Sequence, residues 1–311
     1  MKKFLYSLIL FTLPILLFFI FVEFGIRQIP NDYNYKKSWL DNNVSSVQVL
    51  IAGTSQGLYG INPIYFSKKA FNDCHVSQTP KYDKFLIDKY IEKADALEYI
   101  ILPIAYHSLV YDLEDGQEWW RVKNYCIYYD CPFHKYELKY QTEIYGLNII
   151  SQVKRLGRYI VKDVDAINCD SLGFGTNYTK ANRAEKDWFN NGEGRIKGHT
   201  VDLQKHAIRI VENKDRLNSI AMTCKQNDVK LLLVTMPVHR SYSERIDSLQ
   251  YNLTVEFCDS LINAYDNVKY INLFTDNRFV EDDFYDADHL CEIGAEKFSK
   301  IIDEYIMNLD E

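Results

Sequence analysis

The stretch VQVLIAG, residues 47–53, is a short apolar run that ends at a glycine. A run of this length without a polar face is typical of a strand that is buried on both sides. Three further runs have the same character: LEYIILPIA (97–105), VKLLLVTM (229–236) and VKYINLF (268–274). Helical patterns separate or follow them, after Pro80, at 205–226, at 243–265 and from Ile293 onward. This alternation predicts a mainly parallel sheet with helices on both faces, a three-layer α/β sandwich.

The composition excludes one broad class of function. The chain of 311 residues has 36 basic and 43 acidic side chains and a formal net charge of −7. A general nucleic-acid binder needs a positive footprint, so we expect no nucleic-acid partner. Hydrophobic residues make up 47% and charged residues 25% of the chain, which is the balance of an ordinary folded protein.

The N-terminus has the pattern of a membrane anchor. Lys2 and Lys3 precede a charge-free apolar run, 4–22, whose helical length of roughly 28 Å matches one hydrocarbon core. No small-residue cleavage pattern follows, so we predict an uncleaved single-pass anchor over residues 1–22 rather than a removed signal peptide. The short basic start favours a cytoplasmic N-terminus, although basic residues at 27, 36 and 37 lie on the other side. In a bacterium the anchor would cross the cytoplasmic (inner) membrane, with the remaining chain periplasmic or otherwise extracytoplasmic.

Beyond the anchor the sequence divides into a linker and one large domain. Residues 23–46 are polar and predict a linker, and residues 47–311 predict the α/β domain. Within that domain, residues from about 110 to 204 are rich in Trp, Tyr and Asn and interrupt the alternation. We expect an insertion there, either a lid over one end of the sheet or a helical subdomain with its own aromatic core. As a lid it would offer Trp119, Trp120 and Trp188 as a substrate wall, joined by His239 after the third apolar run.

The cysteines and glycines point to no bound metal or cofactor. Seven cysteines occur without a zinc-ligand spacing, and there is no phosphate-binding glycine loop or dinucleotide fingerprint. Cys126 and Cys131 are spaced for a short disulfide in an oxidising compartment, or they are small buried apolar residues.

Two short segments carry residues with possible chemistry. Gly53-Thr54-Ser55-Gln56-Gly57 follows the first apolar run and places a hydroxyl at the carboxyl edge of the sheet. Asp286-Ala287-Asp288-His289 precedes the last helix, and an aspartate three residues before a histidine can orient the ring as a general base. Each segment also has a structural interpretation: a serine-capped turn, and a helix start with the two aspartates as caps.

Together the two segments resemble the SGNH/GDSL hydrolase superfamily over residues of about 47 to 308. In particular, FYDADHLCEIGAEKFSKII (284–302) looks like the last conserved block of that family. The resemblance implies that Ser55 is the nucleophile, His289 the base and Asp286 its orienting acid, which leaves Asp288 as a helix cap. The chain is most similar to membrane-anchored members near alginate O-acetyltransferase and teichoic-acid D-alanyl-transfer proteins.

The resemblance has two departures, and both concern the oxyanion hole. The family's Gly-Asp-Ser is Gly-Thr-Ser here, and the block that usually offers an Asn is Pro103-Ile104-Ala105-Tyr106-His107-Ser108. The backbone N–H of Ser55 is one expected donor. Asn72 or Gln78, near the family's second block, and His107 or Ser108, in place of the missing Asn, are the candidates for another.

These features predict a membrane-anchored serine esterase or O-acyltransferase. Its expected substrates are ester-linked acyl groups of a cell-surface glycan, or a small ester, and its expected partner is a membrane-embedded acyltransferase. The alternative is a catalytically inactive glycan-binding or scaffold subunit of such a system. The Ser55–His289 separation distinguishes them, because hydrogen-bond reach is ~2.6–3.2 Å and a gap beyond roughly 6 Å favours the scaffold.

Overall fold

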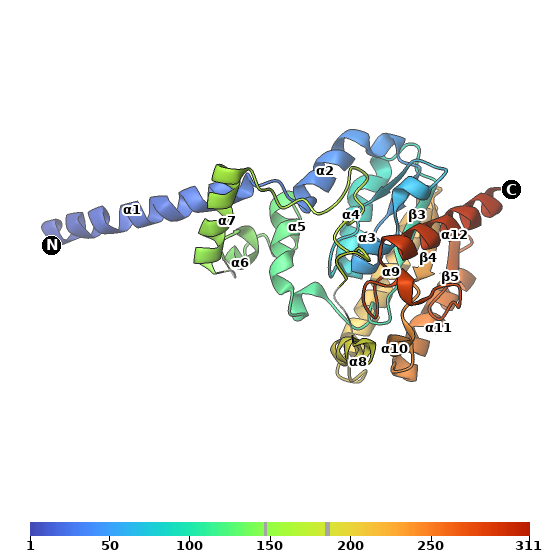
Figure 1. The fold of residues 1–311 in the computed structure, drawn as a ribbon. Coiled ribbons are helices and arrows are strands. Elements are labelled where there is room, and N and C mark those ends of the chain that lie inside the picture. Colours follow the sequence, from blue (N-terminus) through green and yellow to red (C-terminus); the bar gives the residue numbers. More distant parts are fainter. Residues whose placement is uncertain (146–147, 184–186) are drawn as a thin grey trace. The chain divides into compact units, whose positions relative to one another are not determined.

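The computed structural model describes residues 1–145, 148–183 and 187–311. The chain forms two compact units (Figure 1). The first consists of Met1–Lys37 with Gln117–Ile167, and the second of Ser38–Gly116 with Asn168–Glu311.

The second unit is built on a parallel sheet of five strands in the order β2-β1-β3-β4-β5. The strands are β1 (Val49–Ile51), β2 (Ala70–Asn72), β3 (Tyr99–Pro103), β4 (Lys230–Thr235) and β5 (Val268–Asn272). Four of them lie inside the predicted apolar runs. The sequence missed β2 because its three residues follow two lysines and precede an aspartate, which leaves no apolar run to notice.

Helices cover both faces of the sheet, so the predicted three-layer α/β fold is confirmed (Figure 1). On one face α3 (Ser55–Gly60) and α12 (Glu292–Asp310) bury alternate strand residues, and the shared cluster contains Val49, Ile51, Tyr99, Ile101, Leu232, Val234, Leu58, Phe298 and Ile302. On the other face α9 (Ala207–Gln226) contacts β4, α11 (Ser248–Ala264) contacts β5, and α4 (Pro80–Tyr90) packs against α9.

The strand order indicates at which edge of the sheet a ligand would bind. The chain adds β2 on one side of β1 and then returns to add β3 on the other side, so the order reverses between β1 and β3. Ligands of open parallel sheets bind beyond the carboxyl ends of strands at such a reversal. The loops that follow β1, β3, β4 and β5 all leave from this edge, and two short helices, α8 (Trp188–His199) and α10 (Arg240–Ser243), belong to the same unit.

The first unit contains α1 (Lys2–Arg27), α5 (Val122–Tyr128), α6 (Leu138–Gln141) and α7 (Ile149–Lys162). α1 is long and apolar enough to span a membrane, and its side chains are exposed until Val22. From there Val22, Ile26 and Ile29 form a small core with Leu156 of α7. A buried ion pair, with 2.6 Å between Lys123 Nζ and Glu143 Oε2, adds a polar centre to this unit.

The structure differs from the expected linker over residues 23–46. This stretch contains the end of α1, the helix α2 (Asp32–Asn43) and a short 3-10 turn. It is ordered as helix because Ile26, Ile29, Tyr33 and Leu40 are buried at roughly helical spacing despite the polar residues between them.

The expected insertion from about 110 to 204 is likewise divided. Residues 117–167 fold with the N-terminal helix in the first unit, whereas residues from 168 onward fold with the sheet. The aromatic residues of this region therefore belong to two different units.

Candidate active site

The turn after β1 presents Ser55 at the edge of the sheet. Gly53 has φ +133°, a conformation that side chains rarely adopt, and a Cβ there would lie 3.0 Å from Cδ of Pro103. Thr54 is the N-cap of α3, and its hydroxyl oxygen accepts a hydrogen bond from the backbone N–H of Gln56 at 3.3 Å. Thr54 thus has a local role at the position where the resembled family has aspartate.

The loop 284–290 folds around the carboxylate of Asp286. Its ends are joined by a bridge between Phe284 and Leu290, and the Tyr285 N–H donates to the His289 carbonyl at 2.9 Å. Oδ1 of Asp286 accepts the backbone N–H groups of His289 at 2.9 Å and of Asp288 at 3.2 Å. The carboxylate therefore shapes the loop in addition to facing the histidine ring.

The structure brings the three residues singled out by the resemblance into one chain of contacts. Ser55 Oγ lies 2.8 Å from His289 Nε2, and Asp286 Oδ1 lies 2.8 Å from His289 Nδ1. Ser55 lies 234 residues before His289, so only the fold creates this contact. This geometry would allow Ser55 to act as a nucleophile, His289 as a general base and Asp286 as its orienting acid.

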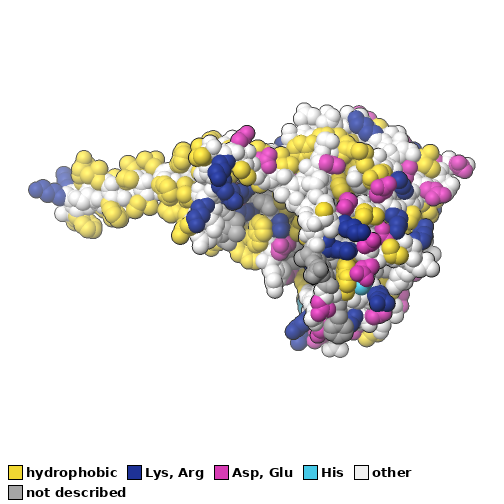
Figure 2. Space-filling model, in the orientation of Figure 1, with side chains coloured by type: hydrophobic (Ala, Val, Ile, Leu, Met, Phe, Trp, Pro, Cys, Tyr) yellow, Lys and Arg dark blue, Asp and Glu magenta, His cyan; other side chains and the backbone are white. Residues whose placement is uncertain are grey.

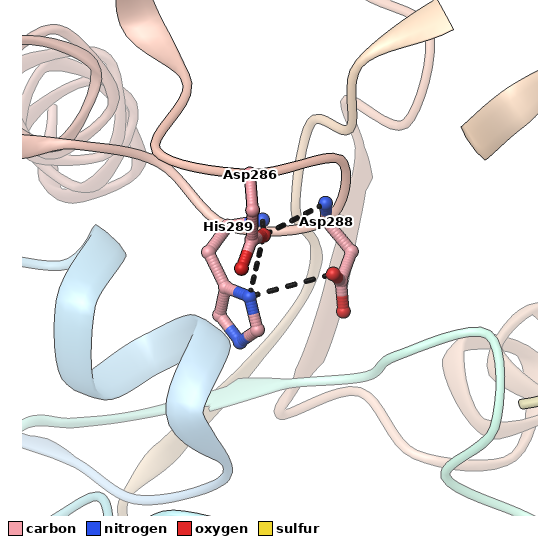
Figure 3. A group of neighbouring side chains, drawn as sticks. All are labelled: Asp286, Asp288 and His289. Carbon is pink, nitrogen blue, oxygen red and sulfur yellow. Dashed lines mark hydrogen bonds and ion pairs between the residues drawn. The ribbon is translucent and has the colours of Figure 1, made fainter. Parts of the chain in front are cut away.

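Asp288 does not cap the last helix, so that interpretation is wrong. α12 begins at Glu292 with Cys291 as its N-cap, whereas the buried Asp288 carboxylate reaches back to the histidine. Its Oδ1 lies 3.4 Å from His289 Nδ1, and Figure 3 shows both carboxylates directed at this same nitrogen. The physical reason is the tight closure of the loop, which turns Asp288 inward before the helix begins.

Arg195 of α8 completes the cluster, and the sequence analysis missed it. Its Nη2 lies 2.5 Å from Asp286 Oδ2, and its Nε lies 3.1 Å from Asp288 Oδ1. Nearby on α8, Asn191 Oδ1 accepts the backbone N–H of Ala287 at 2.7 Å. An arginine within a glycine-rich segment gives no sequence signal of a partner 91 residues away.

The charges around His289 determine its protonation. Burial by itself lowers the pKa of His289, but the negative charges of Asp286 and Asp288 outweigh it and raise the pKa to about 10. For Asp288, burial raises the pKa, but the charges of His289 and Arg195 hold it well below its ordinary value. The cluster therefore holds an imidazolium between carboxylates at neutral pH.

A second chain of rings lies on the far side of Asp288. His199 Nδ1 is 2.8 Å from the Tyr242 hydroxyl and 3.9 Å from Asp288 Oδ2. The His107 ring stacks on His199 with 4.1 Å between ring centres. Burial, followed by the charge of His199, keeps the pKa of His107 well below its ordinary value, so this imidazole is neutral.

The oxyanion candidates differ in whether their polar atoms are already engaged. The Asn72 amide donates to the carbonyls of Gly57 and Ile61, and the Gln78 amide donates to Asp83. Ser108 Oγ accepts the backbone N–H of Ala105. In contrast, Nδ1 of His107 is buried without a hydrogen-bond partner among the described residues.

The wall candidates lie in different units. Trp188 stacks on His239 with 4.2 Å between ring centres, and its indole N–H donates to Glu281 at 2.9 Å. Trp119 and Trp120 belong to the first unit, where Trp119 packs edge-on against Tyr140. Their role as part of a substrate wall stays a prediction.

Tyrosines that the sequence analysis did not select surround the histidine ring. Tyr178 meets the His289 ring edge-on at 5.3 Å. It is stacked between Tyr59, at 3.7 Å, and Tyr285, at 3.9 Å. This column of rings forms an apolar flank to the base.

Asp286, Asp288 and His289 also lie close enough together to ligate a cation. The positive charge that these carboxylates require already comes from Arg195 and from the imidazole. The donor set therefore fits an acid–base cluster better than a metal site.

Comparisons with known proteins come from solved structures alone, since no family model and no curated protein matches the sequence. A Streptococcus pneumonia protein provisionally described as a platelet activating factor is 13% identical, covering 96% of this chain and 98% of that one, with a TM-score of 0.43. A Bacteroides fragilis protein provisionally described as an acylhydrolase is 9% identical over 87% and 95% of the two chains, with a TM-score of 0.40. A GDSL-like lipase from Bacteroides thetaiotaomicron is 10% identical over 90% and 100%, with a TM-score of 0.42.

One of these descriptions, that of the GDSL-like lipase, names the class that the motifs resemble. At TM-scores this low, the fold and the site rest on this chain's own residues.

Proposed function

We propose that this protein is a membrane-anchored serine esterase or O-acyltransferase of the SGNH/GDSL type. The observation that carries the proposal is the contact chain from Ser55 Oγ through the His289 ring to Asp286, with 2.8 Å at each step. A hydroxyl, an imidazole and a carboxylate in this order are the parts that acyl transfer through a serine requires.

In the proposed reaction Ser55 Oγ attacks the carbonyl carbon of an ester while His289 Nε2 takes the hydroxyl proton. The tetrahedral intermediate collapses when the imidazolium gives that proton to the departing alcohol. The acyl group is then bonded to Ser55. A water molecule (hydrolysis) or a sugar hydroxyl (transfer) attacks next, with His289 again accepting the proton and returning it to Ser55.

The negative charge that develops on the carbonyl oxygen requires donors. The backbone N–H of Ser55 is the first that we propose. His107 is the second, because its ring is neutral and its Nδ1 has no hydrogen-bond partner among the described residues. In the tautomer with a proton on Nδ1 the ring is a hydrogen-bond donor, and it belongs to the sequence block in which the resembled family has asparagine. Removing one such donor typically lowers the rate by ~10²–10³.

The anchor and the aromatic side chains favour a substrate on a membrane-proximal glycan. In this proposal α1 crosses the cytoplasmic membrane and the sheet domain lies outside it. Trp188 and His239 present a stacked pair of rings at the sheet edge, and such faces can pack on sugars. A membrane-embedded acyltransferase remains the partner proposed for the transfer reaction.

The scaffold alternative is less well supported. An inactive relative needs no serine within hydrogen-bond reach of a histidine, yet the Ser55–His289 distance lies inside that range. The ion pairs of Arg195 with Asp286 and Asp288 also favour an acid–base role, since they hold two buried charges beside a ring.

Labelling with a fluorophosphonate tests the nucleophile. The full-length protein should be labelled, and Ser55→Ala should abolish the labelling. Ser67→Ala, which removes an exposed hydroxyl bonded to Asp303 instead, should label at the full rate. Equal labelling of the Ser55→Ala protein would show that another residue is the nucleophile.

The Trp188→Ala substitution tests whether the substrate is a glycan. The substitution should lower turnover of an O-acetylated polysaccharide more than turnover of a small acetyl ester. Equal effects on both substrates would remove the support for a glycan wall.

A further inference from the structure

Helix α7 exposes an apolar face that the core of the first unit does not use. Its inward side buries Gln152 and Leu156, whereas Ile150, Val153, Ile160 and Val161 are exposed, Val161 by 79%. A helix in water normally turns polar residues outward. Among the described residues of the unit, this face therefore has no packing partner.

The adjoining face of α7 is strongly basic. The helix IISQVKRLGRYIVK carries Lys154, Arg155, Arg158 and Lys162 and no acidic residue. Three of these, together with Ser151, Gly157 and the apolar Val161, line a shallow hollow of ≈ 680 Å³. In a chain of net charge −7 this is a local excess of positive charge suited to anionic groups.

The amphipathic helix packs directly on the end of α1. A Cβ at Gly25 would lie 2.9 Å from Cδ2 of Leu156, so the two helices meet closely at that point. Before Val22 the apolar side chains of α1 are exposed, whereas Val22 and Ile26, on either side of this contact, are buried. Figure 2 shows Lys and Arg side chains (dark blue) gathered over α7 beside the apolar length of α1. The contact thus marks the level at which a membrane surface would lie.

An apolar recess of ≈ 620 Å³ opens at the same level. It is lined by Phe19, Ile20 and Phe24 of α1 and by Ile144 and Tyr145, with Glu23 and Arg27 among its lining residues. Apolar walls beside a charged pair fit the boundary between acyl chains and headgroups.

We infer that α7 lies in the headgroup layer of the bilayer that α1 crosses, with its exposed apolar side chains among the acyl chains and its basic row on anionic phospholipids. The inference rests on the membrane-spanning role proposed for α1 and is independent of the chemistry at Ser55. Such helices combine an apolar arc with a Lys- and Arg-rich face. Each basic side chain near an anionic surface strengthens the association roughly fivefold.

Quenching by brominated phospholipids tests this placement in the full-length protein. The chain is reconstituted in nanodiscs of phosphatidylcholine, with or without phosphatidylglycerol, as Ile160→Trp or as Ser151→Trp. Ile160 lies on the apolar face, whereas Ser151 lines the basic hollow and serves as the matched control. The fluorescence of the wild-type protein, with its four tryptophans, is subtracted.

We expect the fluorescence added by Ile160→Trp to be strongly quenched, at least threefold more than that added by Ser151→Trp, and most strongly with phosphatidylglycerol. Adding Lys154→Gln, Arg158→Gln and Lys162→Gln, or half-molar salt, should remove the dependence on phosphatidylglycerol. Quenching that is equal in both lipids and insensitive to these changes would overturn the anionic part of the inference.

Three other outcomes would overturn it entirely. An unquenched Ile160→Trp protein in intact nanodiscs would show that α7 stays out of the bilayer. Crosslinks between the α7 helices of two protein molecules would instead assign the exposed apolar face of α7 to a second copy of this chain. A chain that fails to enter nanodiscs would refute the membrane role of both α1 and α7. Fluorophosphonate labelling of Ser55, measured on the same samples, reports separately on the proposed reaction.

Discussion

Two negative charges converge on one nitrogen of His289. An isolated imidazole titrates near ~6.5, but in this site the two aspartates raise the pKa of His289 to about 10 against the opposing effect of burial. A general base must be neutral before it can accept a proton. If His289 is the base, as proposed, it is therefore in the wrong protonation form at neutral pH.

This arrangement predicts an alkaline pH profile. The kcat/KM for a neutral ester should rise with pH through an inflection well above 6.5 and should not level off near neutrality. The same titration affects folding. Because the folded-state pKa is raised, its stabilising contribution is complete below the unfolded pKa and is lost as pH rises through about 10. Initial rates and thermal unfolding between pH 5 and 10.5 check both trends.

Asp288→Asn should move that inflection toward neutral pH. It removes one negative charge that favours the imidazolium, so the pKa of His289 falls by roughly one unit or more, while Asp286 still orients the ring. Turnover at pH 7 should be maintained or increased. Asp286→Asn is the matched comparison and should lower kcat by ~10⁴ at every pH, because the ring loses its orienting acceptor. If Asp288→Asn is instead the inactive variant, the two aspartates have been assigned in the wrong order.

Arg195→Gln should have the opposite effect on the profile. Arg195 is a positioning residue that neutralises both carboxylates: it pairs with Oδ2 of Asp286 and with Oδ1 of Asp288, the oxygen that also faces the ring. Without its charge the carboxylates stabilise the imidazolium more strongly, so the inflection moves to higher pH. At pH 7 we expect kcat/KM to fall on the order of tenfold. Arg195→Lys should recover part of the loss; a fall without any movement of the profile would indicate a purely structural role.

Among the secondary elements, α8 and α4 show how helices determine the state of buried acids. Two side chains of α8 contact the loop 284–290: Arg195 forms an ion pair with Asp286, and Asn191 accepts a hydrogen bond from the Ala287 N–H. This helix therefore contributes directly to the charge of the site. α4 instead buries Asp83, which accepts a hydrogen bond from the Gln78 amide at 2.7 Å. Burial, which outweighs this hydrogen bond, raises the pKa of Asp83 to about 7.

Asp83→Asn in α4 should stabilise the protein at alkaline pH. The raised pKa means that the wild-type carboxyl contributes most at low pH and that this contribution is lost as pH rises through about 7. Asparagine remains neutral and can still accept the hydrogen bond from Gln78. We expect a gain on the order of 2 kcal/mol at pH 8.5 and almost none at pH 4. Thermal unfolding at these two values measures it, and an equal effect at both would mean that ionisation of Asp83 is not the cause.

At the scale of the whole molecule, the exposed apolar helix α1 and the candidate active site belong to different units. The apolar length of α1 is exposed before Val22, while the groups of the candidate active site all belong to the second unit. Within the described residues, no hydrogen bond joins residues 1–21 to the turn at Ser55 or to the loop 284–290.

A chain that begins at Val22 should therefore keep its reactivity and change its membrane behaviour. The full-length protein should require detergent for extraction. The shortened protein should be released by high salt, because only the charge-dependent binding of α7 to the membrane remains. Fluorophosphonate labelling should proceed at an unchanged rate. Fractionation followed by labelling checks both, and loss of labelling in a folded, shortened protein would contradict the separation.

The amino-acid sequence by itself determined the alternation of four of the five strands with helices, and with it the place of Ser55 after β1 and of Asp286 and His289 before the last helix. Apolar runs, helical periodicity and the three-residue spacing of Asp286 and His289 are local patterns, so they are visible before folding. Only the tertiary structure decided the role of Asp288, the contribution of Arg195, the short strand β2 and the division of the aromatic region between two units. The physical reason is that ion pairs between distant segments, and strands shaped by their neighbours rather than by their own residues, depend on long-range packing and leave no periodic trace in the chain.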